Sequence, residues 1–169
     1  QSATFGTDDS WKNKKEGPVT NASNFDGETF DARKHEKGWN KTGFDDTGWN
    51  KASLYAATSA NLCAQMNEPI MVIKEMKPVS VRKVGDDKYI FDLGQNMVGW
   101  CCLSLPYNPA KTITFRYAEI LDEEDQLYIE NLRTARQTDI YIPDKEKQIN
   151  YEPKFTYHGF RYVEIEGLT

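Results

Sequence analysis

The sequence has few of the residues that most often carry enzymatic or metal chemistry. Its 169 residues include two histidines and three cysteines. Cys63, Cys101 and Cys102 are odd in number and lack zinc-ligand spacing, so they indicate neither a disulfide scaffold nor a zinc knuckle. A Gly-rich phosphate loop, a Gly-x-Ser-x-Gly elbow and a histidine pair at metal spacing are also missing. The sequence therefore offers no familiar nucleophile, phosphate or metal motif.

Long hydrophobic runs and an excess of positive charge are missing as well. The longest apolar runs, such as residues 70–73, have four residues, whereas a membrane-spanning helix needs about 20. Lys and Arg number 21 against 26 Asp and Glu, which gives a net charge of −5. Nucleic acids and membranes are therefore not expected as partners.

The chain length fits one domain, or one domain with part of another. The sequence begins at Gln1 and shows no basic-then-apolar leader, so we expect a segment of a longer protein whose targeting signal lies elsewhere or has been removed.

Short apolar alternations separated by turn residues dominate the chain after Pro69 and predict a β-sandwich. Residues 122–136 fit either an amphipathic helix or a long loop with one helical turn. Residues 1–68 are rich in turn formers and predict loops and short strands. We therefore predict an all-β fold: a loop-rich partial domain at 1–68 and an antiparallel β-sandwich or jelly roll at 69–169. The strands expected in the second region lie near 79–81, 89–93, 97–105, 111–120, 139–142 and 160–166.

Aromatic rings mixed with acids and amides are typical of sugar-binding surfaces, because a ring covers the C–H face of a pyranose while polar groups bond its hydroxyls. Asp26, Glu28 and Trp39 form such a mixture and are our candidate carbohydrate-binding residues, with packing inside the fold as the alternative role. Acidic runs in turns, such as Asp122 to Asp125, suit calcium but match no defined ligand loop. Neither a metal site nor another cofactor is predicted.

Several blocks of sequence resemble bacterial α-L-rhamnosidases. FDGETFDAR at 25–33 and FDDTGW at 44–49 are similar to the end of that family's N-terminal accessory domain. FDLGQNMVGW at 91–100 and FTYHGFRYVE at 155–164 resemble the concanavalin-like β-sandwich that follows it. The resemblance implies a parent glycoside hydrolase that removes terminal L-rhamnose by inversion, using two carboxyl groups. It places those groups in an (α/α)6 catalytic domain beyond Thr169, with rhamnose-containing glycans as substrates and a periplasmic or extracellular location.

Two hypotheses for this chain follow from the resemblance. In the first it is a non-catalytic scaffold for the catalytic domain, and in the second it is an independent carbohydrate-binding module that recognises rhamnose. Two glycines flank amides in the 94–99 block, which is typical of a tight turn or bulge. We predict that Gln95, Asn96 and His158 help to dock the sandwich against the catalytic domain, while a purely structural hydrogen bond is the alternative role for His158.

Overall fold

The computed structural model describes residues 6–56 and 59–169, which form two compact units. The small unit is drawn from Gln1–Gly17 and Glu36–Met71. The sheet unit comprises Pro18–His35 and Val72–Thr169. The domain boundary predicted after residue 68 stays a prediction, and these units divide the chain elsewhere because residues 18–35 pack with the later strands.

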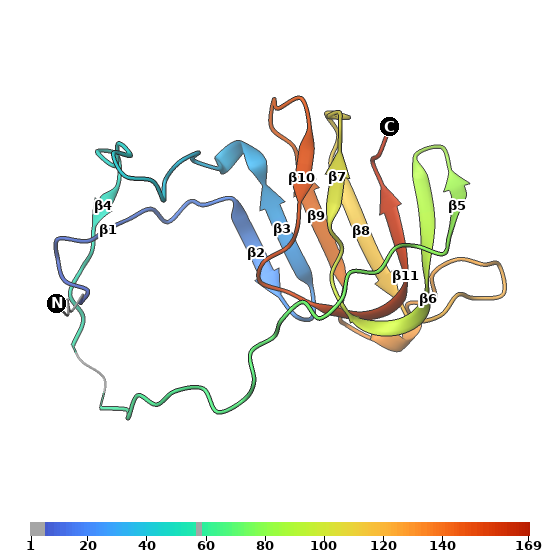
Figure 1. The fold of residues 1–169 in the computed structure, drawn as a ribbon, viewed down its shortest axis with the longest axis horizontal. Coiled ribbons are helices and arrows are strands. Elements are labelled where there is room, and N and C mark those ends of the chain that lie inside the picture. The colour runs from blue at the N-terminus through green and yellow to red at the C-terminus, as the bar shows by residue number, and fades with distance from the viewer. Residues whose placement is uncertain (1–5, 57–58) are drawn as a thin grey trace. The chain divides into compact units, whose positions relative to one another are not determined.

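A seven-stranded sheet forms the larger layer of the sheet unit (Figure 1). Neighbouring strands are antiparallel except β3 and β9, which run parallel. In sheet order the strands are β2 (Val19–Ser23), β3 (Gly27–Asp31), β9 (Thr138–Ile142), β8 (Ile113–Ala118), β11 (His158–Glu166), β6 (Lys88–Gly99) and β5 (Ser80–Gly85).

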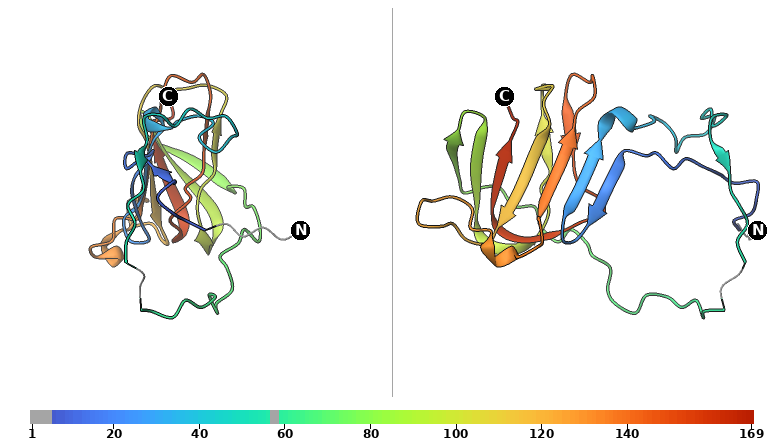
Figure 2. Two further views of the ribbon diagram at one scale, coloured as in Figure 1. Left: turned by 90° about the vertical axis from the view of Figure 1, so that its left-hand side faces the viewer. Right: turned by 180° about the vertical axis from the view of Figure 1, so that it is seen from behind.

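A second layer of two strands, β7 (Leu103–Leu105) and β10 (Ile149–Tyr151), packs on one face of this sheet, which we call the inner face. Figures 1 and 2 show the two layers from three directions. The Tyr151 ring lies 5.7 Å from Phe115 and 5.0 Å from Tyr141, measured between centroids. These buried contacts confirm the predicted β-sandwich.

Strand β8 shows how the sequence builds this layer. Ile113, Phe115 and Tyr117 are buried, while Thr114 and Arg116 between them are only partly buried. Successive side chains of a strand point to opposite faces, so the apolar set fills the core and the polar set lies on the outer face. The sequence alternation that predicted the strand also fixes which face is inward.

One predicted strand is wrong. Residues 97–105 do not form a continuous strand, because β6 ends at Gly99 and β7 begins at Leu103. The chain leaves the large sheet between these points and enters the second layer, so one apolar run serves both layers. The Trp100 indole N–H, which lies in this crossing, donates to Glu152 at 2.9 Å.

The segment at 122–136 is a loop with one helical turn, which decides between the two predicted alternatives. Its 3₁₀ turn, η2, covers Glu130–Leu132. Asp122 Oδ1 accepts the backbone N–H of Glu124 at 3.1 Å and of Gln126 at 2.7 Å. Such side-chain bonds to nearby backbone favour turns over a continuous helix. Within residues 6–56 and 59–169, no helix is long and apolar enough to cross a membrane.

The small unit is rich in loops, as predicted. Its strands β1 (Lys12–Asn13) and β4 (Asn50–Lys51) pair antiparallel. The Trp49 ring meets Phe44 edge-on at 5.8 Å, and its indole N–H donates to Glu36 at 2.9 Å. In the sheet unit, a 3₁₀ turn named η1 (Ala32–Lys34) follows β3.

Candidate functional site

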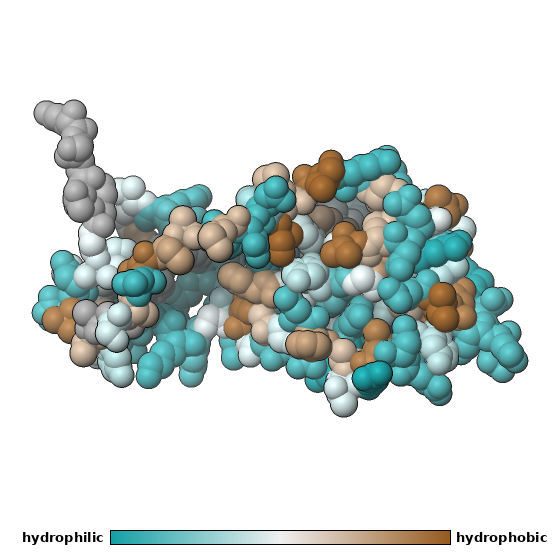
Figure 3. All heavy atoms as spheres, turned by 90° about the horizontal axis from the view of Figure 1, so that it is seen from below, coloured by the Kyte–Doolittle hydropathy of each residue, from teal (hydrophilic) through white to brown (hydrophobic). Residues whose placement is uncertain are grey.

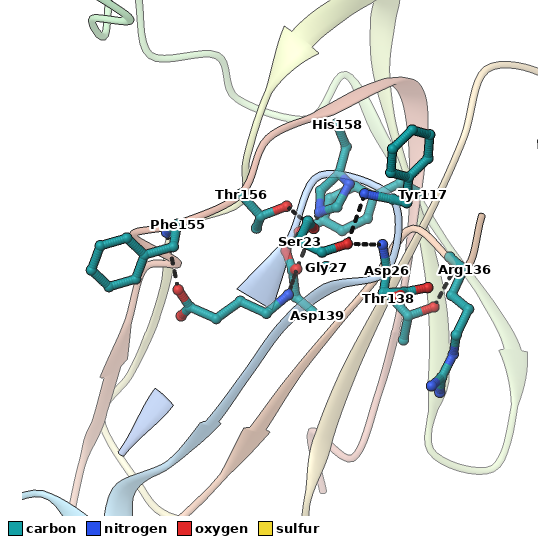
Figure 4. Close-up of polar contacts among 12 residues, drawn as sticks. Ser23, Asp26, Gly27, Tyr117, Arg136, Thr138, Asp139, Phe155, Thr156 and His158 are labelled. Carbon is teal, nitrogen blue, oxygen red and sulfur yellow. Dashed lines mark hydrogen bonds and ion pairs between the residues drawn. The ribbon is translucent and has the colours of Figure 1, made fainter. Parts of the chain in front are cut away.

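A group of polar side chains lies buried on the inner face, beside the apolar core (Figure 4). Asp139 is 0% exposed, Glu28 1% and His158 2%. Acidic side chains are almost never this deeply buried unless they are paired, because removing them from water costs free energy. Each of them must therefore find its hydrogen bonds within the protein.

Asp139 is the centre of this buried cluster. Its carboxylate accepts the Tyr117 hydroxyl at 2.6 Å, His158 Nε2 at 3.1 Å and the backbone N–H of Glu28 at 2.8 Å. The Tyr117 and His158 rings stack with their centroids 4.2 Å apart. Burial raises the pKa of Tyr117 well above its usual 10.0, so the hydroxyl keeps its proton and donates.

Glu28 joins the first strands to the chain that leads into β11. Its Oε1 accepts the Tyr151 hydroxyl at 3.2 Å. Its Oε2 accepts the backbone N–H groups of Lys154 at 2.9 Å and Phe155 at 3.1 Å. Both carboxylate oxygens are thus bonded to donors of the chain itself, which gives Glu28 a structural role. Sugar binding by this residue stays a prediction.

The turn from β2 to β3 brings Glu28 to Asp139. Gly27 has a φ of +96°, and a Cβ there would lie 2.2 Å from the Thr138 carbonyl oxygen. Only glycine fits so close an approach at positive φ. Ser23 Oγ accepts the Asp26 backbone N–H at 3.0 Å, and the Asp26 carbonyl accepts the Thr138 N–H at 3.0 Å. Asp26 therefore positions the turn through its backbone.

The three predicted sugar-binding residues belong to different units. Asp26 and Glu28 lie in the sheet unit, whereas Trp39 lies in the small unit with 55% of its surface exposed. A shared sugar site at these residues therefore stays a prediction.

Of the predicted docking residues, Gln95 and Asn96 are exposed on β6. β6 pairs with β11 at Asp92, opposite Tyr162, and at Met97, opposite Phe160. Four residues of β6 but only one residue of β11 lie between these two pairs, so this part of β6 bulges. The Asn96 amide donates to Glu119 at 3.1 Å.

His158, the third predicted docking residue, is buried against Asp139 and presents no surface to a partner. Its Nδ1 has no hydrogen-bond partner among the described residues. These facts favour the structural role for His158, and docking by all three residues stays a prediction.

Sequence reasoning missed Asp139 and Tyr117, the two residues at the centre of the buried cluster. The available signal was their place in alternating strands. Tyr117 follows Ile113 and Phe115 on the inward side of β8, and Asp139 precedes the inward Tyr141 on β9 by two residues. A carboxylate at an inward strand position predicts a buried polar partner.

Metal-ligating side chains do not gather in the described part of the chain: no three of its His, Cys, Asp and Glu residues form a group that could hold an ion. Burial also raises the pKa of Cys101 to about 12, which keeps this thiol protonated and unreactive at neutral pH.

A cavity of about 450 Å³ lies on the outer face of the large sheet. It is bounded by β8, β9 and the loop that carries η2. Its lining comprises Thr114, Arg116, Tyr117, Ile129, Leu132, Arg133, Thr134, Ala135, Arg136, Thr138 and Ile140. No local sequence pattern indicates this cavity, because the loop meets the strands only in the folded chain.

Two family models match the sequence. Residues 82–169 match the bacterial alpha-L-rhamnosidase concanavalin-like domain, and residues 1–74 match the alpha-L-rhamnosidase N-terminal domain. The chain belongs to the bacterial α-L-rhamnosidase family. This confirms the resemblance inferred from the sequence blocks, and it assigns this chain to the N-terminal and β-sandwich part of such proteins.

Curated relatives agree with this assignment. An α-L-rhamnosidase of Alteromonas sp. strain LOR is 40% identical over 96% of this chain, which covers 18% of that relative. One of Streptomyces avermitilis is 38% identical over 90% of this chain, covering 15% of the relative. The chain thus spans less than a fifth of these relatives.

Solved structures of α-L-rhamnosidases share the fold. The enzyme of Dictyoglumus thermophilum superposes with a TM-score of 0.88 at 41% identity, over 95% of this chain and 18% of that one. The Aspergillus terreus enzyme gives 0.87 at 33% identity, over 96% and 19%. The Streptomyces avermitilis enzyme, solved with L-rhamnose, gives 0.80 at 37% identity, over 90% and 15%.

Proposed function

We propose that this chain is the non-catalytic β-sandwich part of an α-L-rhamnosidase and acts as a scaffold for its catalytic domain. The parent enzyme would release terminal L-rhamnose from glycans by inversion, in the periplasm or outside the cell, with its catalytic carboxyl groups in an (α/α)6 domain. Family membership supports the parent's activity.

The observation that carries the scaffold role is the bonding of the buried carboxylates. Inverting hydrolysis needs two carboxyl groups roughly 6.5–9.5 Å apart that face the substrate and leave room for a water molecule. Glu28 and Asp139 are buried, and each is bonded to several donors of the chain. Carboxylates held in this way join strands and loops, and they are withdrawn from a substrate.

An activity assay tests the first half of the proposal. The 169-residue chain and the full-length parent would each be mixed with an aryl α-L-rhamnoside, and release of the phenol would be measured. We expect release by the parent and only background release by the chain. Release above background by the chain alone would overturn the non-catalytic role.

A titration tests the scaffold against the independent-module alternative. The chain would be titrated with L-rhamnose, with and without calcium, while chemical shifts are recorded. We expect no saturable shift for a scaffold. Saturable shifts would favour a rhamnose-binding module.

Docking is tested in the full-length parent with the Asn96→Ala substitution, which removes the exposed amide bonded to Glu119. We expect a lower melting temperature or altered kinetics. Asn24→Ala, at another exposed position, serves as the matched control. Unchanged stability and unchanged kinetics for Asn96→Ala would contradict docking at this site.

A further inference from the structure

The cavity lies on the outer face of the sheet, whereas the side chains of the buried cluster lie on the inner face; Tyr117 belongs to both sets of residues. Arg116 and Thr138 line it from the strands, and Ile129, Arg133 and Arg136 line it from the loop. Its volume of about 450 Å³ falls within the roughly 300–1,000 Å³ of typical small-ligand sites. The cavity is therefore large enough for a sugar residue.

The charge of the lining is positive, although the chain as a whole is acidic. The cavity is lined by three arginines and by no carboxylate, in a chain of net charge −5. The charge of Arg116 is already matched, because its Nη1 donates to Glu164 at 2.7 Å and to Glu166 at 3.3 Å. Arg133 and Arg136 are exposed. No ion pair within the described part of the chain involves either of them.

The backbone that carries these two arginines has an unusual conformation. Arg133 has a φ of 57° and a ψ of −105°, and Gln137 has a φ of 41°. Non-glycine residues at such angles are strained and gather at functional sites. The Gln137 N–H donates to the Phe25 carbonyl at 2.9 Å, and the Thr138 hydroxyl donates to the Arg136 carbonyl at 2.7 Å. Surrounding bonds thus hold the strained segment in place.

The rest of the lining suits a polyhydroxylated ligand. Threonine hydroxyls can bond sugar hydroxyls, and the side chains of Ile129, Leu132 and Ile140 can cover a C–H face. Two planar guanidinium groups suit a carboxylate, which each can bind through two parallel N–H donors. In Figure 4 the Arg136 side chain extends away from the buried cluster.

We propose that this cavity binds the carboxylate of an acidic sugar, a uronate residue of a glycan. The inference rests on the proposed function only in taking a glycan as the ligand. An acidic protein surface would be attracted by the same two charges, but a protein interface usually has a continuous apolar centre. Seen from below, the surface in Figure 3 shows apolar side chains scattered among hydrophilic ones, and the lining of the cavity itself mixes threonines and arginines with apolar side chains.

The test is a titration of the 169-residue chain with D-glucuronate and D-galacturonate, followed by NMR or calorimetry. We expect saturable binding of at least one of them, with a dissociation constant on the order of 1 mM for a ligand of this size. D-glucose, which has no carboxylate, should bind at least about tenfold more weakly, because it lacks the charge-assisted hydrogen bonds to the two arginines.

Matched variants locate the binding. The double substitution Arg133→Gln with Arg136→Gln should weaken uronate binding at least about tenfold. Lys145→Gln with Lys147→Gln removes the same charge from exposed positions in another loop and should leave binding unchanged. Arg133→Lys keeps the charge but loses the planar fork, so we expect an intermediate affinity. Thermal melts of all variants check that each one folds.

Three outcomes would overturn the proposal. One is the absence of saturable uronate binding by the folded, unsubstituted 169-residue chain. Another is equal binding of acetate and uronate, which would show an adventitious anion site only. The third is binding of an acidic peptide while both uronates are silent, which would mark a protein-docking surface. Failure of the parent to cleave an aryl rhamnoside would sink the proposed function without changing any of these titrations, so the two failures are distinguishable.

Discussion

The buried cluster on the inner face of the sheet and the cavity on its outer face treat charge in opposite ways. On the inner face, Asp139 and Glu28 are removed from water and bonded to donors of the chain itself. On the outer face, Arg133 and Arg136 remain exposed beside a cavity. Buried charges need several fixed partners, whereas exposed charges are stabilised by water and stay free to meet a ligand. The buried cluster therefore has a structural role, whereas the residues of the cavity are available for recognition.

The largest loss of stability should come from Gly27→Ala, because this residue lies in the turn that places Glu28 on the inner face. The new Cβ would lie 2.2 Å from the Thr138 carbonyl oxygen at a φ of +96°, and we expect a loss of about 3 kcal/mol in the free energy of unfolding. Chemical denaturation measures it. Gly99→Ala, where a Cβ would meet nothing within 4 Å, is the control. Equal losses for the two variants would show that the approach at Gly27 is unimportant.

Asp139→Asn should have the second-largest effect on stability. The Asp139 carboxylate accepts three hydrogen bonds, whereas one end of an asparagine amide can only donate. We expect a loss of about 2–3 kcal/mol, because donors buried without an acceptor cost their full desolvation. Asp86→Asn, at an exposed turn position, should change stability by less than about 0.5 kcal/mol. Urea denaturation of both variants makes the comparison, and a similar small change in both would contradict the buried network.

The outer-face counterpart is Arg116→Gln, which removes a partner of Glu164 and Glu166. We expect a loss of only about 1 kcal/mol, since the arginine side chain is 40% exposed and the buried Glu164 keeps Lys88 as a partner at 3.5 Å. The same denaturation experiment measures it. A loss as large as that of Asp139→Asn would break the contrast between the two faces.

The smallest expected effect is on the stability of the protein at acid pH. Two bonds from Arg161, each 2.9 Å long, hold the pKa of Asp92 below its usual 3.8. A lowered carboxyl pKa contributes stability above pH 3.8, and that stability is lost as the pH falls through the folded-state value. Asp92→Asn should therefore flatten the loss of stability below about pH 4, by less than about 1 kcal/mol because the pair is partly exposed. Denaturation at pH 3 and pH 7 tests this. If Asp92→Asn lost as much stability between pH 7 and pH 3 as the unsubstituted chain, the ion pair of Asp92 with Arg161 would not contribute to acid sensitivity.

Much of the fold was predictable because alternation records burial directly. The strands near 113–118, 138–142 and 160–166, and the hairpin of β5 and β6, follow from residues that alternate between core and solvent. The division of 97–105 between two layers was not predictable, since a short apolar run looks the same whether one sheet or two receive it. Loop and helix could not be separated at 122–136 until the Asp122 bonds were seen.

The sites were harder to predict than the fold. Glu28 was noticed as an acid near aromatics, but its partners Tyr151 and Lys154 lie more than 120 residues away in the sequence. The sequence does not predict that Arg133 and Arg136 lie near Arg116, because this grouping depends on how the loop meets β8. Contacts between distant segments carry no local sequence pattern, so residue types alone could not assign these roles.

The parallel pairing of β3 with β9 joins the two segments that the family models match separately. Strand β3 lies within residues 1–74, matched by one family model, and β9 lies within residues 82–169, matched by the other. A recombination event between the two matched segments would leave β9 with an open edge and Asp139 without the N–H group of Glu28. Neither matched segment therefore carries the complete sheet, and each depends on the other for its fold.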